Sequence, residues 1–407
     1  MDTPRSSRLP GFAGLAPATL VLIVSFLAFI SIGFPDAVLG VAWPSVRRTF
    51  DLPQTGLGSI LFFSALGYCT SGLVAGVLIE RLGVGKLLVI STGLVACGLL
   101  GYAMTPLFAV FLGLAVLVGL GSGAIDSALN VYAAEHFSEA VMNRLHAFFG
   151  LGALVGPLIM GAVLSNDQSW RWGYVIVGFV LLLMMVVFVI TRDLWGNGAH
   201  HQGESTVAAP VREVLRHPMV WLSVVIFFFC TGVEFTGGQW AYTVMRERFG
   251  QSAGVASLWA GLYWGALAVG RLTLGMVSAR VGTARMVQIS IAGNIFGSVL
   301  YAVGSYEVAA AGLLLMGFWM APLFPLLMSL TPRRLGSAIA VHSVGFQVSA
   351  AVFSGSVFPW IAGYLSERTS FEAVGWVAFT GGVILFGLHG LMMYFDRRRA
   401  QVEVVSS

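Results

Sequence analysis

Long runs of apolar residues, separated by short clusters of charged residues, proline and glycine, repeat along the whole chain. Several of these runs exceed the roughly 20 residues that an α-helix needs to cross a bilayer. In hydrocarbon every backbone amide must be satisfied within its own segment, so the runs are predicted to be transmembrane helices. The pattern predicts twelve spans, near residues 17–46, 54–79, 86–105, 107–135, 142–165, 170–191, 217–246, 253–279, 284–304, 308–330, 336–365 and 370–395.

One extended polar stretch interrupts the series of spans. Residues 192–216 are polar and include Gly196, Asn197, Gly198, His200, His201 and Gln202, which is typical of a flexible linker. Equal numbers of predicted spans precede and follow it. We therefore expect an N-terminal six-helix bundle at residues 1–191, a cytoplasmic linker at 192–216 and a C-terminal six-helix bundle at 217–407.

The positive charges are concentrated at alternate ends of the predicted spans. When both chain ends are placed in the cytoplasm, most of the 22 Lys and Arg residues fall on the cytoplasmic side, as the positive-inside rule requires. Residues 1–10 are polar and have no signal-peptide pattern, so the first span is expected to direct insertion. We predict a multi-pass protein of the inner (plasma) membrane, with both termini cytoplasmic, that functions as a monomer.

Composition supports the membrane assignment and excludes several other classes. With 57% hydrophobic and 10% charged residues and a mean hydropathy of +0.87, the chain has too little polar surface for a soluble globule. The net charge of +4 does not indicate a nucleic-acid partner, because Lys and Arg are scattered singly at span ends. The three cysteines (Cys69, Cys97 and Cys230) lie in apolar runs and form neither a disulfide framework nor a metal-ligand spacing. No nucleophile with a matching base is found either, so we predict no enzymatic activity, no metal and no cofactor.

An internal repeat relates the two halves of the chain. The segment from Gly76 to Lys86 reads G-x-x-x-E-R-L-G-x-x-K, and the segment from Gly275 to Arg285 reads G-x-x-x-A-R-V-G-x-x-R, at an offset of 275 − 76 = 199. The same offset aligns Gly33, Arg47 and Phe50 of the first span with Gly232, Arg246 and Phe249 of the seventh. Two ungapped matches at one offset indicate duplicated halves.

The first of these two loops resembles the signature loop of the major facilitator superfamily. The resemblance implies an all-α polytopic fold with two pseudo-symmetric six-helix bundles, which rock to open a central cavity to either side in turn. The residues that would form the gating loops are Gly76, Glu80, Arg81, Gly83 and Arg280. The glycines permit a tight turn, and the charged residues lie where helix ends attract them. The second loop departs from the signature because Ala279 replaces the acid.

Ionisable residues within the spans are the candidates for a transport site. Each costs about 2.5 to 3.5 kcal/mol on insertion scales, so such residues usually face a cavity. Asp36 follows Gly33 and Pro35, which weaken the helix and are expected to open backbone groups toward the cavity. Asp126 and Asn130 lie one turn apart on the fourth span and therefore share a face. Because burial disfavours a charged carboxyl, these acids are expected to take up a proton on one side and release it on the other.

The fourth and fifth spans narrow the resemblance. Residues 126–132 (D-S-A-L-N-V-Y) resemble the acid-T-A-A-N-P-Y segment of fucose permease-like sugar:proton symporters, and residues 144–152 resemble the stretch that follows it. Asp36 matches that group's acid on the first span. The resemblance implies that Asp36 and Asp126 serve proton coupling and sugar recognition. The chain departs from the group by having Asp at 126, Val131 for a proline and His146 for a glutamine, which leaves the identity of the substrate open.

Further site candidates lie on the seventh span and beyond. Glu234, Gln239 and Trp240 flank two glycines, which predicts a broken helix with an aromatic face for a sugar ring and polar groups for its hydroxyls. Glu234 is also a third candidate for proton coupling. His146 is expected to titrate near neutral pH, to bind a hydroxyl, or to be structural. The remaining substrate-binding candidates are Asn294, His342 and Gln347, and Arg271 is expected to pair at a gate or to snorkel.

The fifth span carries a signal for the opposite direction of transport. Gly152, Gly156-Pro157 and Gly161 resemble the Gly-Pro motif of proton-coupled drug antiporters, although small residues and proline serve helix packing in either direction. The sequence thus predicts a secondary active transporter that couples protons to uptake of a small neutral polar solute of the sugar class. The alternative is a proton-coupled antiporter that exports drugs or metabolites. Sodium is an alternative coupling ion, because carboxylates and exposed carbonyls also bind it.

Overall fold

The computed structural model describes residues 17–195 and 209–406, and all regular structure in these residues is helical. The first half of the chain forms α1 (Pro17–Phe50), α2 (Gly56–Leu82), α3 (Val84–Met104), α4 (Phe108–His136), α5 (Glu139–Ser165), α6 (Trp170–Thr191) and the short 3-10 helix η1 (Arg192–Trp195). The second half forms α7 (Val211–Arg216), α8 (Pro218–Thr243), the π-helical turn η2 (Val244–Arg248), α9 (Ala253–Val281), α10 (Thr283–Val303), α11 (Tyr306–Met320), α12 (Leu323–Leu335), α13 (Ser337–Arg368) and α14 (Glu372–Ser406).

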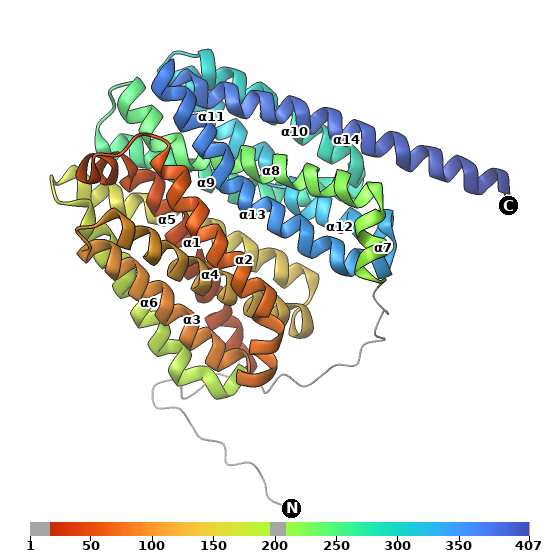
Figure 1. Cartoon of the computed structure of the whole chain (residues 1–407), viewed down its shortest axis with the longest axis horizontal. Helices are drawn as coiled ribbons and strands as arrows, with labels where there is room; N and C mark the ends of the chain where they lie inside the picture. The colour runs from red at the N-terminus through yellow and green to blue at the C-terminus, as the bar shows by residue number, and fades with distance from the viewer. Residues whose placement is uncertain (1–16, 196–208, 407) are drawn as a thin grey trace, which may run out of the picture.

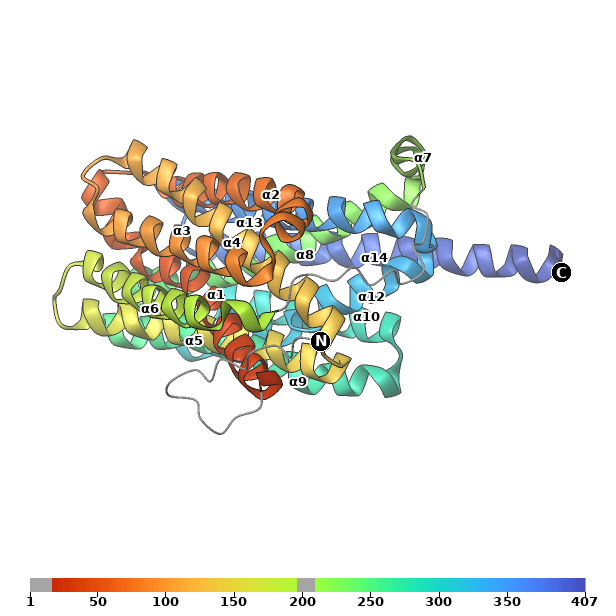
Figure 2. The ribbon, with the colours of Figure 1, turned by 90° about the horizontal axis from the view of Figure 1, so that it is seen from below.

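The described residues contain twelve helical segments that are long and apolar enough to cross a membrane. This confirms the predicted number of spans, and their bounds agree with the predicted ones to within a few residues except where α14 continues beyond the expected end. The molecule is therefore an all-α, multi-pass membrane protein built from two six-helix halves, α1–α6 and α8–α14 (Figure 1). At one end of the molecule α14 projects past the other helices (Figure 2).

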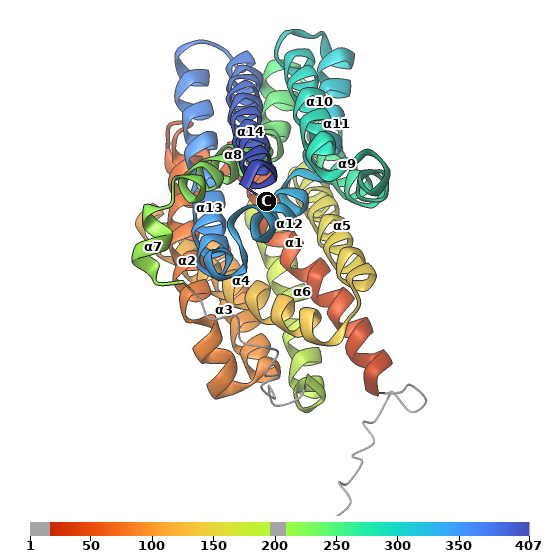
Figure 3. The same cartoon turned by 90° about the vertical axis from the view of Figure 1, so that its right-hand side faces the viewer.

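The two halves meet along two lateral seams. Seen from the end at which α14 projects, α13 lies beside α2 on one side of the molecule, and α5 lies beside α9 on the other (Figure 3). Helix α1 also contacts α8 across the centre. Each seam therefore joins one helix of the N-terminal half to one helix of the C-terminal half, which is where relative motion of the halves would have to occur.

The internal repeat is reproduced in the helices. Adding the sequence offset to the bounds of α3 (Val84–Met104) gives the bounds of α10 (Thr283–Val303). The glycine that precedes each helix has a positive φ angle, 76° at Gly83 and 90° at Gly282. Such positive φ angles are strained for residues with a Cβ atom, so both turns require glycine. The repeated glycine of the two loops is thus a backbone requirement for the sharp reversal between two spans.

Two predictions about local structure need correction. The tenth span is interrupted between α11 and α12, where Pro322 and Pro325 each lack the N–H group that would donate a backbone hydrogen bond. The predicted flexible linker is structured at both ends: Trp195 of η1 is buried against Tyr132, and Val214 of α7 is fully buried. The predictions for residues 1–10 and for the polar centre of the linker, 196–208, lie outside the described residues.

Candidate functional site

Two carboxylic acids of the N-terminal half lie together between α1, α2 and α4. The Tyr68 hydroxyl donates a hydrogen bond to Oδ2 of Asp126 at 2.7 Å, and Nδ2 of Asn130 donates to Oδ1 at 2.9 Å. Asp36 is near enough for its carboxyl to interact electrostatically with that of Asp126. All four side chains are partly exposed. We call this set the acid cluster; it offers carboxyl, amide and hydroxyl groups to protons and to a polar solute.

Close helix packing places Tyr68 against Asp126. A Cβ atom at Gly123 of α4 would lie 2.6 Å from the carbonyl oxygen of Tyr68, and one at Gly119 would lie 3.0 Å from its amide nitrogen. Only glycine permits this approach of the two backbones. The glycines that precede Asp126 therefore bring α2 close enough for the tyrosine hydroxyl to reach the carboxylate.

Helix α1 is continuous through Asp36, which corrects the expectation that Gly33 and Pro35 would weaken it. Gly33 instead allows α5 to approach, since a Cβ atom there would lie 2.7 Å from the amide nitrogen of Ala153. Glycine at this position is thus used for packing between helices. The Asp36 carboxyl reaches its partners from an intact helix.

Gln239 connects the acid cluster to the C-terminal half. Its side chain is fully buried, and Nε2 donates a hydrogen bond to the carbonyl oxygen of Asp36 at 2.7 Å. Its Oε1 is buried without a hydrogen-bond partner among the described residues. Gly40 faces the backbone of Gln239, where a Cβ atom would lie 2.7 Å from the carbonyl oxygen. Gln239, predicted to bind substrate together with Glu234 and Trp240, is therefore a bridge from α8 to the backbone of Asp36 on α1.

A second charged group lies on the seam between α5 and α9. Oε1 of Glu234 on α8 is 3.8 Å from Nη2 of Arg271 on α9, and the two side chains are 8% and 18% exposed. His146 on α5 interacts electrostatically with Arg271 and packs edge-on against Phe29, with ring centroids 5.2 Å apart. We call these three residues the Arg271 cluster. Arg271 thus joins two predicted site residues, Glu234 and His146. From the sequence, Arg271 itself was predicted only to pair at a gate or to snorkel.

The predicted break in the seventh span is wrong. Helix α8 is continuous through Gly237 and Gly238, and a Cβ atom at Gly237 would lie 2.8 Å from the Tyr263 ring. The helix changes to π geometry only at Val244. Trp240 is fully buried and donates a hydrogen bond to the carbonyl oxygen of Pro359 on α13 at 3.2 Å, so its ring packs two helices together instead of lining an open face.

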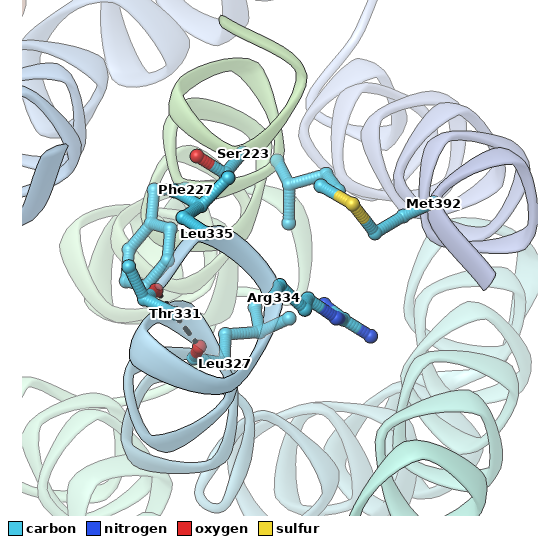
Figure 4. Close-up of a pocket in the computed structure, with 8 residues that line it drawn as sticks. Ser223, Phe227, Leu327, Thr331, Arg334, Leu335 and Met392 are labelled. Atoms are coloured by element: carbon cyan, nitrogen blue, oxygen red, sulfur yellow. Dashed lines mark hydrogen bonds between the residues drawn. The ribbon is translucent and has the colours of Figure 1, made fainter. Parts of the chain in front are cut away.

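The structure does not bring the last three predicted residues to either cluster. Gln347 is buried within the C-terminal half, where Nε2 donates to Oγ of Ser223 at 2.9 Å and Oε1 accepts from Oγ1 of Thr331 at 3.1 Å. Those two partners line a small pocket beside Arg334 (Figure 4). Asn294 on α10 is buried and donates to the carbonyl oxygen of Met316 on α11 at 3.4 Å. His342 is partly buried and makes no hydrogen bond or ion pair with any described residue.

The predicted gating-loop residues lie at the surface of the molecule. Glu80, Arg81 and Arg280 are exposed and form no ion pair within the described part of the chain. Cβ atoms at Gly76 and Gly275 would meet no atom within 4 Å. The Cβ positions of these two repeated glycines are therefore open, whereas a Cβ atom at Gly85, in the same loop segment as Gly76, would lie 2.9 Å from Cα of Arg192.

The opposite end of the molecule is closed. The backbone N–H of Gln54, just before α2, donates to Oε1 of Glu367 on α13 at 2.5 Å. A Cβ atom at Gly363 would lie 2.8 Å from the Gln54 carbonyl oxygen, and one at Gly58 would lie 2.8 Å from Cα of Trp360. Two of these three contacts between the halves involve backbone atoms on both sides, so the halves are closely packed at this end.

The glycines of the Gly-Pro motif on α5 are accounted for by packing. A Cβ atom at Gly156 would lie 3.0 Å from the carbonyl oxygen of Phe34 on α1, and Gly152 similarly faces Ile30. Gly161 faces Ser257 of α9 across the seam. These contacts join α5 to both halves and would be needed whichever way a solute moves. The motif therefore does not favour export over uptake.

Sequence reasoning missed Tyr68. A tyrosine in an apolar span carries no charge, so it does not stand out from lipid-facing aromatic residues. The available signal was its neighbour Gly67, whose Cβ position would lie 2.7 Å from the amide nitrogen of Leu120 on α4. A small residue at that place marks the face of α2 that meets α4, and Tyr68 follows it directly.

Comparison with known proteins places these observations in a family. Residues 21–354 match the Major Facilitator Superfamily. The chain is 20% identical to the glucose/mannose transporter GlcP of Bacillus subtilis, over 90% of this chain and 93% of that protein. Its fold resembles the crystal structure of the nucleoside transporter NupG, with a TM-score of 0.75 at 14% identity, covering 93% of this chain and all of that one. It also resembles the fucose:proton symporter FucP of Escherichia coli, with a TM-score of 0.63 at 17% identity, covering 92% and 98% of the two chains.

Proposed function

The chain belongs to the major facilitator superfamily, and we propose that it takes up a small neutral polar solute of the sugar class together with protons, by alternating access. It is a membrane transporter and not an enzyme, as its family and relatives are. Sugar transporters are among those relatives. The choice of substrate class, the coupling to protons and the direction of transport are the parts that we propose.

The observation that carries the proposal is the acid cluster. Two carboxyls that interact with one another cannot both hold a full negative charge at low cost, so a proton bound by one relieves the repulsion. The hydrogen bonds from Tyr68 and Asn130 hold the Asp126 carboxyl in place. The partly exposed Asp36 can exchange protons with water on whichever side is open. Proton binding and release would therefore follow the change of access.

The same groups suit a neutral polyol. Carboxylates and an amide present acceptors and donors for hydroxyl groups, and a site of this kind discriminates against molecules that leave its polar groups unpaired. Arg271 is already paired with Glu234, so the cationic side chain is neutralised before any solute enters. This pairing favours a neutral solute over an organic anion.

The conformation indicates how access would alternate. We propose that α1–α6 and α8–α14 move as two bundles, and that 192–216 connects them on the cytoplasmic side. In the described state the Gln54–Glu367 contact closes one end, and the positive-inside rule assigns that end to the outside of the cell. Opening it requires the Gln239–Asp36 hydrogen bond across the halves to break. That bond lies beside the acid cluster, so protonation and opening would act on the same residues.

Uptake into liposomes tests the proposal. Purified protein should accumulate radiolabelled glucose or fucose when the outside is made acidic, and dissipating the gradient with a protonophore should abolish accumulation. Asp126→Asn should abolish accumulation and spare exchange of sugar at equal concentrations, because an amide has nearly the shape of the carboxyl but cannot bind and release a proton. Accumulation by Asp126→Asn equal to wild type would reject proton coupling through this cluster.

The same liposomes separate the alternatives. Accumulation driven by an imposed sodium gradient at equal pH would reassign the coupling ion. If no sugar is taken up and hydrophobic cations instead move against their own gradient, in the direction opposite to the protons, the protein is an exporter. Arg397→Gln is a suitable control, because Arg397 is exposed in the C-terminal part of α14 and belongs to neither cluster.

A further inference from the structure

The short helix α7 (Val211–Arg216) lies between the linker and the membrane span that begins with α8. It runs across the direction of α13 and α14 at the outer edge of the C-terminal half (Figure 1, Figure 2). Val214 is fully buried, and the backbone N–H of Ala209 donates a hydrogen bond to the carbonyl oxygen of Ala338 on α13 at 3.1 Å. Only His217 separates α7 from the span. Helix α7 therefore lies at the surface of the bilayer.

Helix α7 has an apolar edge and a cationic edge. Residues four apart share a side of an α-helix. Val211 and Leu215, which are 46% and 42% exposed, form the apolar edge. Arg212 and Arg216, which are exposed and form no ion pair with any described residue, form the cationic edge. Because successive residues are rotated by about 100°, the buried Val214 places the cationic edge on the side away from the protein, with the apolar edge beside it.

The apolar edge continues onto the lipid-facing side of α8. Nε1 of Trp221 donates a hydrogen bond to the carbonyl oxygen of Leu215 at 2.8 Å, and the indole lies parallel to the Phe346 ring of α13, with centroids 6.5 Å apart. Trp221 and Val225 lie one turn apart and are both exposed, although they belong to a membrane span, so they face lipid. Tryptophan near the end of a span is typical of the bilayer interface. Lipid that covers this side of α8 thus also reaches the apolar edge of α7.

We propose that α7 is an interfacial helix that binds anionic phospholipid, with its apolar edge against the acyl chains and its cationic edge at the phosphate groups. Arginine side chains beside an apolar edge can extend to phosphate groups while their methylene stems cover hydrocarbon. Glu213, the remaining charged residue of α7, lies opposite the apolar edge and therefore faces water.

The occupant of this surface is lipid and not a soluble protein, because the apolar edge continues a surface that already faces the bilayer. Two unpaired arginines beside it favour an anionic headgroup over a zwitterionic one. Helix α7 is joined by hydrogen bonds to α13 and to α8, so a bound lipid would hold the ends of both helices at the membrane surface.

Fluorescence quenching in vesicles tests the proposal on the full-length protein. A bimane label at Leu215→Cys, in a background without the native cysteines, reports contact with lipids that carry a nitroxide near the headgroup. Phosphatidylglycerol should bind at this label about 25-fold more tightly than phosphatidylcholine, because each arginine near the surface contributes about fivefold. Combining Arg212→Gln with Arg216→Gln should remove this preference. Salt at about 1 M, where the Debye length is about 3 Å, should weaken the preference without any change to the arginines.

Matched labels and variants test the orientation of α7 and exclude general effects of charge. A label at Glu213→Cys should be quenched by neither lipid, and one at Val186→Cys, an exposed position of α6, should be quenched by both alike. Combining Arg48→Gln with Arg246→Gln removes two exposed arginines near the opposite end of the molecule and should leave the preference at Leu215→Cys unchanged. The proposal is overturned if neither lipid quenches the label at Leu215→Cys, if both quench it equally, or if the preference survives removal of the cationic edge.

Discussion

Replacement of Gly58 by alanine should shift the protein toward the state that is open at the end now closed. Gly58 lies on α2 at the seam with α13, where a Cβ atom would lie 2.8 Å from Cα of Trp360 and 3.0 Å from the carbonyl oxygen of Ser356. Both atoms belong to a helix backbone of the other half, so they cannot turn away as a side chain would. Accommodating the methyl group requires α2 and α13 to separate.

The size of the shift follows from the cost of overpacking. Inserting a methyl group into such a contact costs about 1–3 kcal/mol, and only the state with the seam closed bears this cost. Since about 1.4 kcal/mol corresponds to a tenfold change in an equilibrium constant, the ratio of open to closed molecules should rise about 5-fold to 140-fold. Alanine is the better helix former by about 1 kcal/mol, but this gain applies to both states and does not alter their ratio.

Electron paramagnetic resonance distances measure the ratio directly. Spin labels at Arg48→Cys and Ser370→Cys, both exposed near the closed end, should report a longer distance in Gly58→Ala than in the parent, in a background without the native cysteines. Gly72→Ala is the matched control on the same helix, because a Cβ atom there would meet nothing within 4 Å. If Gly58→Ala and Gly72→Ala give the same distance distribution as the parent, the seam does not control this end.

Three further predictions concern the clusters and the gating loop. Tyr68→Phe removes the 2.7 Å hydrogen bond to Asp126, a loss of roughly 1.5 kcal/mol that should slow gradient-driven uptake about tenfold in liposomes; an unchanged rate would remove Tyr68 from the site. Arg271→Gln leaves the buried Glu234 carboxylate unpaired and should cost about 3–5 kcal/mol of stability, whereas adding Glu234→Gln should restore most of it in thermal melts; no restoration would mean that the two side chains are not coupled. Gly83→Ala should lower the melting temperature, because its backbone conformation (φ 76°, ψ 157°) is essentially restricted to glycine and costs alanine about 1–3 kcal/mol; Gly76→Ala, with open space at its Cβ position, should not.

The number and order of the spans could be predicted from sequence because the bilayer imposes a simple local rule. A segment that enters hydrocarbon must be apolar, helical and about 20 residues long, and each of these properties is visible within one window of sequence. The repeated loop was also readable locally, since Gly83 and Gly282 are required by the backbone of their own turn. These features could be predicted because each depends only on residues that are close together in the sequence.

The role of glycine inside the spans was not readable in the same way. Gly33, Gly237 and Gly238 looked like breaks in helices, but they permit close contact with neighbours that lie far away in the sequence. A local pattern cannot distinguish a residue that weakens its own helix from one that admits another helix. The break near Pro322 is the one that has a local cause, because proline lacks the backbone N–H group. The length of the apolar run did not reveal this break, since the run continues through it.

The sequence by itself determined that this protein lies in a lipid bilayer, where its helices are, and that its halves are duplicated. It also identified the acidic residues within the spans as candidates for the transport site. The tertiary structure decided which of those groups meet. It joined Asp126 to Tyr68, set Glu234 against Arg271, and placed Gln347 and Asn294 in packed networks away from both clusters. The physical reason is that hydrophobicity and backbone geometry act within a single helix, whereas a binding site depends on the packing of several helices and therefore on contacts that no single segment specifies.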